Sequence, residues 1–205
     1  MFDTTRTKAG ENYYTESEEK KLWAHLRRLK DRLGERDFAL MKTMRLLGLR
    51  RVETIRLNVG DVWRKTRLQV TGRIAAKGCT GELDIPVELQ GVLEAFCKLK
   101  RQWGEDLSDD APLFVSRNGG RLCVRAVNDL VAKRNTEAGI TSRITPHGSR
   151  HTKAQRIMRD DRYLPPEMKA NAMALAQKQL RHKSINSTAI YTAPTREEMA
   201  QVAGI

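Results

Sequence analysis

The chain has 205 residues, and its hydrophobic content of 40% is enough for one sizeable core. Its 38 Lys and Arg residues against 25 Asp and Glu residues give a formal net charge of +13, spread along the chain. An excess of this size favours a polyanionic partner, most simply nucleic acid, over a charged surface without such a partner. No apolar run is long enough for a membrane span, and the polar N-terminus lacks the apolar segment of a signal peptide. We therefore expect a cytoplasmic protein.

The cysteines and the acidic pairs do not indicate a metal centre. Cys79, Cys97 and Cys123 are widely spaced and form no C-x-x-C pair, so neither a zinc site nor a disulfide framework is expected. The pairs Asp109-Asp110 and Asp160-Asp161 lie in charged, loop-like surroundings that are typical of a solvated surface. The sequence therefore predicts no metal ion and no cofactor.

The N-terminal quarter carries three helical patterns. An S/T-x-x-E capping box begins at Thr15, and the apolar residues after it recur at helical spacing, so we expect a helix that is stopped by Gly34. A second apolar set predicts a helix up to Gly48, and a third helix is expected to begin near Arg51.

Between residues 62 and 87 the pattern changes to short alternating segments separated by glycines. Val62-Trp63, Leu68–Val70 and Leu83–Val87 predict a small antiparallel sheet with a long hairpin around Lys77. Further helices are expected at about 88–103, 124–138, 148–159, 166–180 and from 195. The predicted fold class is therefore α+β, mostly helical with one small antiparallel sheet.

Residues that suit the cleavage of a phosphodiester lie in three short stretches. They are Gly48-Leu49-Arg50-x-x-Glu53, Pro146-His147-x-x-Arg150 and Leu180-Arg181-His182, the last followed by Tyr191 nine positions after its histidine. Cleavage by a hydroxyl requires neutralisation of charge on the nonbridging oxygens, loss of a proton from the nucleophile and gain of one by the leaving alkoxide. Metal ions held by carboxylates can meet these needs, and cationic side chains are the alternative that this sequence offers.

The side chains in these stretches fit those needs, although a single arginine in so basic a chain is more often a surface residue. Arg50 and Arg150 are candidate phosphate clamps, because a guanidinium is always charged and can donate two parallel hydrogen bonds to phosphate oxygens. His147 and Arg150 are three residues apart, so on a helix they share a face and would point at one phosphate. The phenol of Tyr191, with a pKa of about 10 in water, needs a cationic pocket or a base to attack at neutral pH.

Together the three stretches resemble the catalytic domain of the tyrosine recombinase (phage integrase) family, from about Tyr13 to the C-terminus. The resemblance implies that Tyr191 attacks a DNA phosphate, forms a 3′-phosphotyrosine and releases a 5′ hydroxyl, and that a 5′ hydroxyl of a partner strand then reverses the step. It also implies that Glu53 supports Arg50 and that a hairpin lysine, Lys77, protonates the leaving oxygen. The catalytic set that it implies is Arg50, Lys77, His147, Arg150, His182 and Tyr191.

Other residues compete for these roles. The competitors are Arg45 and Arg51 for the first arginine, Arg73 for Lys77, the adjacent His151 for His147, and Tyr13, Tyr14 and Tyr163 for the nucleophile. We prefer Lys77 to Arg73 because an arginine, with a pKa above about 12, is a poor proton donor. Tyr191 is preferred because it alone stands at the family interval after a histidine.

The chain departs from the family pattern at three places. Ser149 stands where a leucine usually precedes the second arginine, so the core contact of that leucine is expected to be lost or rearranged. Arg181 stands where a glycine usually precedes the last histidine. A glycine there permits a tight approach or a positive φ, so Arg181 either alters the backbone or supplies another DNA contact. The stretch around Tyr163-Leu164-Pro165-Pro166 reads as an inserted loop.

The resemblance predicts one catalytic domain over residues 13–205 after a disordered lead-in at 1–12, without the family's separate DNA-clamping domain. It implies a site-specific recombinase that integrates, excises or inverts DNA. The alternatives are an activity like that of type IB topoisomerases and a non-catalytic DNA-binding regulator on the same fold. The nine-residue interval favours a recombinase over the first, and the complete catalytic set argues against the second.

The implied partner is double-stranded DNA, bound by a homo-tetramer that can be a monomer in free solution. Such a protein would be cytoplasmic and associated with the nucleoid. The segment Thr195–Val202 is helix-forming, and Met199, Val202 and Ile205 make a narrow apolar stripe that is too short to be stable alone. We expect this tail to dock on its own domain or on a neighbouring protomer.

Overall fold

The structure is a computed structural model that describes residues 12–159, 168 and 171–181. In this part of the chain the elements are α1 (Glu16–Leu26), α2 (Arg32–Leu47), α3 (Arg51–Ile55), α4 (Val59–Val62), β1 (Arg67–Val70), β2 (Gly81–Asp84), α5 (Val87–Gln102), α6 (Val124–Glu137), α7 (Pro146–Arg159) and α8 (Ala172–Leu180). The two strands form one sheet, so the prediction of a mostly helical fold with a small antiparallel sheet is confirmed. The expected lead-in, apart from Asn12, and the expected helix from residue 195 lie outside the described residues.

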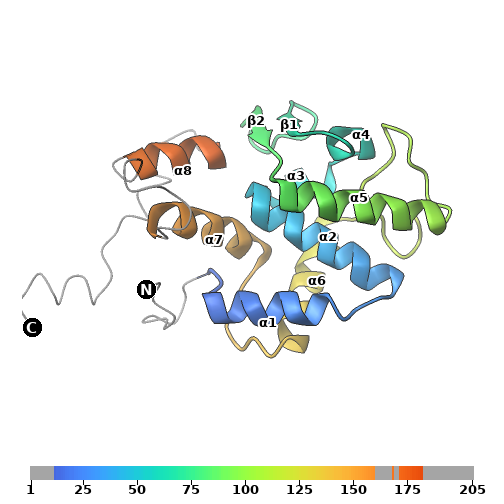
Figure 1. Cartoon of the computed structure of the whole chain (residues 1–205), viewed down its shortest axis with the longest axis horizontal. Coiled ribbons are helices and arrows are strands. Elements are labelled where there is room, and N and C mark those ends of the chain that lie inside the picture. The colour runs from blue at the N-terminus through green and yellow to red at the C-terminus, as the bar shows by residue number, and fades with distance from the viewer. Residues whose placement is uncertain (1–11, 160–167, 169–170, 182–205) are drawn as a thin grey trace, which may run out of the picture.

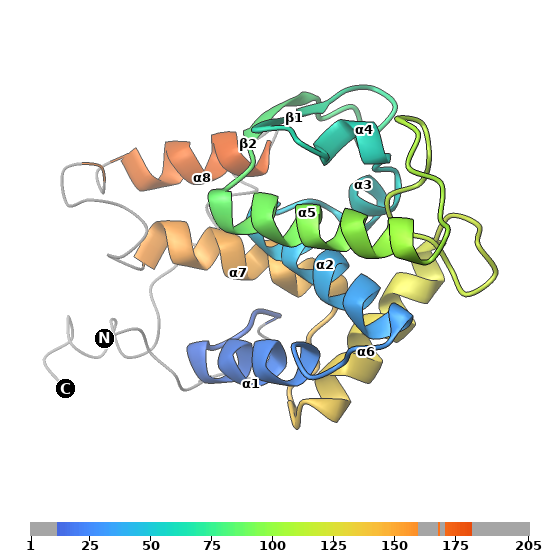
Figure 2. The same ribbon diagram turned by 45° about the vertical axis from the view of Figure 1, so that its right-hand side comes forward.

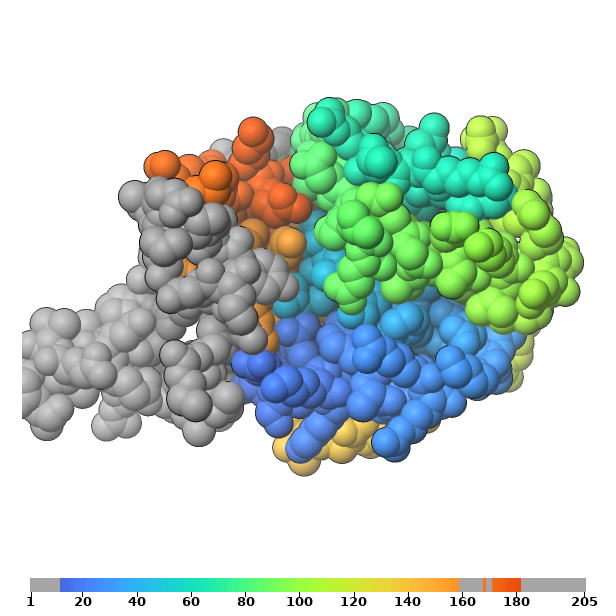
Figure 3. Space-filling model, viewed as in Figure 1, coloured from blue at the N-terminus to red at the C-terminus, as the bar shows by residue number. Residues whose placement is uncertain are grey.

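Helix α2 lies at the centre, and the other elements are arranged around it. It packs against α1, α5 and α7, while α8 packs on α7 (Figures 1 and 2). In the space-filling view, α1 and α2 cover the lower part of one face, and α5 with the strand hairpin covers the upper part (Figure 3). The buried residues Leu40, Met41, Met44 and Leu47 of α2 belong to the hydrophobic core that these elements share.

The end of the first helix differs from the sequence prediction. α1 ends at Leu26, and Asp31 caps α2, where its carboxylate accepts the backbone N–H groups of Leu33 and Gly34 at 2.9 and 3.0 Å. Gly34 therefore lies in the first turn of α2 and does not stop α1. Its small size is required by packing, because a Cβ at Gly34 would lie 2.3 Å from the Cβ of Leu29.

The sheet is smaller than predicted, because two of its expected segments are partly helical. β1 and β2 pair antiparallel, with Arg67 opposite Asp84. Val62 lies in α4, a short helix in which the carboxylate of Asp61 accepts the backbone N–H of the N-cap residue Asn58 at 2.6 Å. The second strand ends at Asp84 because Pro86 caps α5, and a proline has no N–H to donate to a strand neighbour.

Most of the remaining helices begin and end close to their predicted positions. α3, α5 and α6 match within a residue or two, whereas α8 ends at Leu180 as expected but begins at Ala172, six residues later than predicted. α7 begins at Pro146, two residues earlier than expected, because a proline fits the first turn of a helix. None of the helices in the described residues is long and apolar enough to cross a membrane.

Buried ion pairs fix the central helices relative to one another. Glu19 of α1 accepts hydrogen bonds from Arg45 of α2 at 2.6 and 3.1 Å and from Arg156 of α7 at 3.1 Å. Asp37 of α2 pairs with Arg134 of α6 at 2.6 Å. The C-terminal end of α2 and helix α7, which carry two of the predicted stretches, are therefore both tied to α1 through Glu19.

Candidate active site

The first stretch begins where α2 ends. Gly48 adopts φ +65°, and a Cβ there would lie 2.9 Å from Cδ2 of Leu180 and 3.4 Å from Cγ of Lys153. Both the left-handed backbone and the close approach of α7 and α8 therefore require a glycine. The turn at Gly48 places Arg50 at the N-cap position of α3.

Arg50 and Glu53 form a compact pair at the start of α3. The Glu53 carboxylate accepts the backbone N–H of Arg50 at 2.9 Å and its Nη1 at 3.0 Å. The side chain of Glu53 is fully buried, while that of Arg50 keeps 21% of its surface exposed. Burial alone would raise the pKa of Glu53, but the positive charge of Arg181, the N–H of Arg50 and the charge of Arg50 outweigh it and hold the pKa below its usual value. Glu53 is therefore an anion that fixes one edge of the Arg50 guanidinium.

Lys77 lies in the hairpin loop of residues 71–80, between β1 and β2, with an exposed side chain and φ +56°. Arg56 of the turn after α3 anchors this loop by donating to the carbonyl of Ala75 at 2.9 Å. Arg73, the competitor for the lysine role, donates to the carbonyl of Arg56 at 2.6 Å and pairs with Asp61 at 2.5 Å. These two contacts of the Arg73 guanidinium hold the loop against the turn after α3 and against α4.

His147 stands in the first turn of α7, where positive charges converge on it. The edge-to-face ring of His151 is 4.4 Å away, centroid to centroid. The His147 ring reaches the surface, but surrounding protein excludes part of its water. This desolvation, followed by the charges of Arg150, Arg50, Arg51 and Lys77, lowers the pKa of His147 from its usual value. The structure therefore brings Arg50, Lys77, His147 and Arg150 into one cationic cluster.

Arg150, the second candidate phosphate clamp, is buried. Its side chain is 1% exposed, and its guanidinium donates to the carbonyl of Gly48 at 2.6 Å and to the carbonyl of Leu180. These contacts connect the end of α2 with the end of α8 beneath the cluster. Ser149, next to it, is also buried, so the position of the usual leucine still faces the interior.

The sequence predicts that Arg181 either alters the backbone or supplies another DNA contact, and the contacts that its side chain makes are not indicated by any sequence pattern. The residue caps α8 with φ +52°, so the positive φ that a glycine would supply is kept by an arginine. A left-handed conformation costs a residue with a Cβ about 1–2 kcal/mol. Its side chain is turned inward, where Nη2 lies 2.6 Å from Oε2 of Glu53 and Nε donates to the carbonyl of Cys79 at 3.3 Å. The Glu53 partner is distant in sequence, and no local pattern indicates it.

Two members of the predicted set, His182 and Tyr191, lie outside the described residues, as does the competing Tyr163. Tyr14 is a core residue, because it is buried and its hydroxyl donates to Oδ1 of Asn135 at 3.0 Å. Within the described part of the chain, no group of three His, Cys, Asp or Glu side chains is arranged to hold a metal ion.

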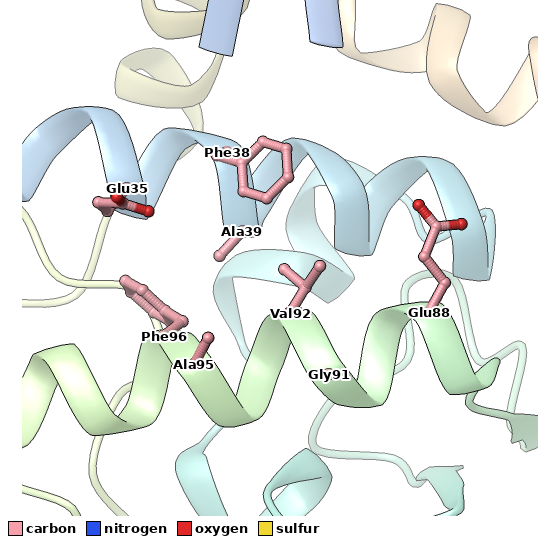
Figure 4. Close-up of a pocket in the computed structure, with 8 residues that line it drawn as sticks. All are labelled: Glu35, Phe38, Ala39, Glu88, Gly91, Val92, Ala95 and Phe96. Carbon is pink, nitrogen blue, oxygen red and sulfur yellow. The ribbon is translucent and has the colours of Figure 1, made fainter. Parts of the chain in front are cut away.

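A pocket of about 340 Å³ lies between α2 and α5, and no residue of the cationic cluster lines it (Figure 4). Phe38, Val92 and Phe96 supply much of its apolar wall, and its charged lining residues are Glu35 and Glu88. No basic side chain lines this pocket, so it offers no cationic group to bind a phosphodiester. The cluster around His147, not this pocket, is therefore the candidate active site.

Known proteins share both the sequence pattern and the fold. Residues 12–198 match the model of the phage integrase family. The tyrosine recombinase XerC of Vibrio vulnificus is 31% identical over 173 residues, which cover 84% of this chain and 50% of that protein. XerC of Vibrio campbellii is 30% identical over 174 residues, which cover 83% of this chain and 50% of that protein. The chain thus spans about half the length of the curated relatives it matches.

Solved structures of tyrosine recombinases have the same fold. XerA recombinase superposes with a TM-score of 0.73 at 21% identity, over 98% of this chain and 65% of that chain. XerH site-specific recombinase bound to palindromic difH substrate gives a TM-score of 0.68 at 20% identity, over 99% of this chain and 56% of that chain. With the family match over residues 12–198, these similarities establish that the chain belongs to the phage integrase family.

Proposed function

We propose that this chain breaks and rejoins double-stranded DNA as a site-specific recombinase, with Tyr191 as the nucleophile. The observation that carries the proposal is the cluster around His147, in which the positive charges of Arg150, Arg50 and Lys77 all act on one imidazole. Converging positive charge of this kind favours a phosphate dianion-like transition state more than it favours any neutral ligand. The family match and the similarity to curated tyrosine recombinases support the same reaction class.

In the proposed mechanism the phenol oxygen of Tyr191 attacks the phosphorus atom and the bond to the 5′ oxygen breaks. The phenol proton passes to a base, for which His147 is suited because its lowered pKa keeps the ring neutral at pH 7. Lys77 gives its proton to the leaving 5′ oxygen, so a 5′ hydroxyl and a 3′-phosphotyrosine result. A 5′ hydroxyl from a partner strand then attacks the phosphotyrosine, which restores the phosphodiester and the phenol.

Arg50 is the guanidinium placed to bind the phosphate in this mechanism, since it is partly exposed and oriented by Glu53. Arg150 supplies positive charge to the same site while its Nη1 and Nη2 donate to the carbonyls of Gly48 and Leu180. His182 belongs to the proposed catalytic set through the family resemblance.

We further propose that the protein acts as a homo-tetramer on DNA, is a monomer in free solution, and associates with the nucleoid in the cytoplasm. Recombination joins four DNA ends, so two duplexes with two half-sites each would require four nucleophiles. Analytical ultracentrifugation with and without the DNA site tests the assembly. A stable tetramer without DNA, or a species with one protomer as the only recombining complex, would contradict it.

The test of the reaction is covalent trapping. Wild-type protein and the Tyr191→Phe variant are incubated with a pool of duplexes of randomised sequence that carry one nick, which lets the cut end diffuse away. We expect SDS-resistant protein–DNA adducts with wild type, also in EDTA, and none with Tyr191→Phe, which lacks only the attacking oxygen. Adducts from the phenylalanine variant would refute the nucleophile. Complete loss of cleavage in EDTA would indicate a metal-dependent nuclease instead, and DNA binding without any adduct would indicate a regulator.

A further inference from the structure

Glu53 receives hydrogen bonds from three separate parts of the chain. Arg50 of the first stretch reaches both carboxylate oxygens, and the backbone N–H of Ala76 in the hairpin loop donates to Oε1 at 3.3 Å. Nη2 of Arg181, at the end of α8, donates to Oε2 at 2.6 Å. One fully buried carboxylate therefore joins the start of α3, the loop of Lys77 and the end of α8.

Arg181 also contacts the hairpin loop directly. Its Nε donates to the carbonyl of Cys79 at 3.3 Å, two residues after Lys77. A Cβ on Gly81 would lie 3.1 Å from Cδ of Arg181, so the stem of the arginine passes close along the base of β2. Both ribbon views show α8 beside the strand hairpin (Figures 1 and 2).

The backbone conformation at position 181 is one that favours glycine over arginine. Arg181 has φ +52°, a conformation that glycine adopts without cost and that strains residues with a Cβ. Only 5% of the side chain is exposed, so the guanidinium is not presented to a ligand in solution. Its contacts with Glu53 and Cys79 are therefore what the arginine adds over a glycine.

We propose that Arg181 is a positioning residue that fixes Arg50 through Glu53 and fixes the Lys77 loop through Cys79, so that both cations face one phosphate. This inference rests on the proposed function. It differs from a role in DNA contact, in which the charge of Arg181 would add to affinity. It differs also from a role as a helix cap, in which glycine would serve at least as well.

The experiment compares Arg181→Gly and Arg181→Lys with wild type in single-turnover cleavage of the trapped DNA site, over a range of DNA concentrations. We expect Arg181→Gly to lower the maximal rate roughly 100-fold, the order of loss for a small displacement of reacting groups, with the DNA concentration at half-maximal rate changed less than about 3-fold. Arg181→Lys keeps the charge beside Glu53 and should recover part of the rate. Lys178→Ala, which removes an exposed charge from the same helix, should cleave like wild type.

A double-variant comparison tests the route through Glu53. In a Glu53→Gln background, Arg181→Gly should lower the rate much less than it does in wild type, because the shared anion is already gone. Wild-type cleavage by Arg181→Gly, in a protein shown to be folded by circular dichroism, would overturn the proposal. A rise in the half-maximal DNA concentration with an unchanged maximal rate would assign Arg181 to DNA contact. Absence of any adduct with wild type would instead refute the proposed function.

Discussion

Arg50 and Arg150 differ in how much of each guanidinium is available to a ligand. The Arg50 side chain is 21% exposed and is held by Glu53 along one edge. Arg150 is nearly inaccessible and donates to two backbone carbonyls. At the scale of the residue, we therefore propose Arg50 as the direct phosphate ligand, while Arg150 connects the end of α2 with the end of α8.

The first prediction concerns Arg50. Arg50→Ala should slow single-turnover cleavage about 10²–10³-fold, the loss typical for one donor to a developing anion. DNA affinity should change little, since many other basic side chains share the phosphate contacts. Arg51→Ala is the matched control, because Arg51 is exposed, adjacent and bonded to Asn128. Equal effects of the two substitutions on the rate at pH 8 would contradict the assignment.

The second prediction concerns pH. If neutral His147 accepts the phenol proton, the cleavage rate should fall on acidification only below pH 6.5, since desolvation and then the charge of Arg150 lower the pKa of this ring. Arg51→Ala removes one of the charges that lower the pKa of His147, so the fall in cleavage rate on acidification should move toward higher pH. His147 would not be the base if the rate of the wild type fell on acidification with a midpoint above pH 6.5. The same conclusion would follow if this midpoint moved toward lower pH in the variant.

At the scale of the element, sequence patterns correctly predicted the helix ends that are determined by neighbouring residues in the chain. The capping box at Thr15 and the turn at Gly48 are local features, and both were placed correctly. The predicted end of α1 was wrong because Gly34 was interpreted only by its low helix propensity. In the structure Gly34 lies within α2, where its close packing against Leu29 requires a glycine. The inward turn of Arg181 could not be predicted, because it depends on Glu53, which is far away in sequence.

The third prediction concerns that glycine. Gly34→Ala should destabilise the protein by about 1–3 kcal/mol, because the new methyl group overlaps Leu29. Gly91→Ala, in the middle of α5 with nothing within 4 Å of the added Cβ, should stabilise it by about 0.5–1 kcal/mol. Urea unfolding of both variants gives the comparison. A stabilising Gly34→Ala would show that the residue acts only through helix propensity.

At the scale of the whole molecule, stability depends on buried charges that join distant helices. Glu19 lies between Arg45 and Arg156 and so connects α1 with α2 and α7. Burial alone would raise the pKa of Glu19, but the two arginines outweigh it and lower the pKa. Because the unfolded chain has the ordinary value near 4.5, this contribution is complete above pH 4.5 and is lost as the pH falls through the lower, folded-state pKa.

The fourth prediction follows from this ion cluster. Glu19→Gln should cost about 3–5 kcal/mol at pH 7, because two buried guanidinium groups lose their anion. The difference from wild type should shrink as the pH is lowered below 4.5. Glu16→Gln, which removes a partly exposed carboxylate paired with the exposed Lys20 on the same helix, should cost less than about 1 kcal/mol. A similar, pH-independent cost for both substitutions would contradict the role of the cluster.

The measurement that tests the central claim most directly is identification of the residue that carries the DNA. The adduct trapped on nicked duplex is digested with a protease, and the DNA-linked peptide is identified by mass spectrometry, together with the chemistry of both strand ends. The account predicts a 3′ phosphate joined to Tyr191 and a free 5′ hydroxyl on the released strand. Linkage to Tyr13, Tyr163 or a serine, or a 5′-phosphate linkage, would contradict it.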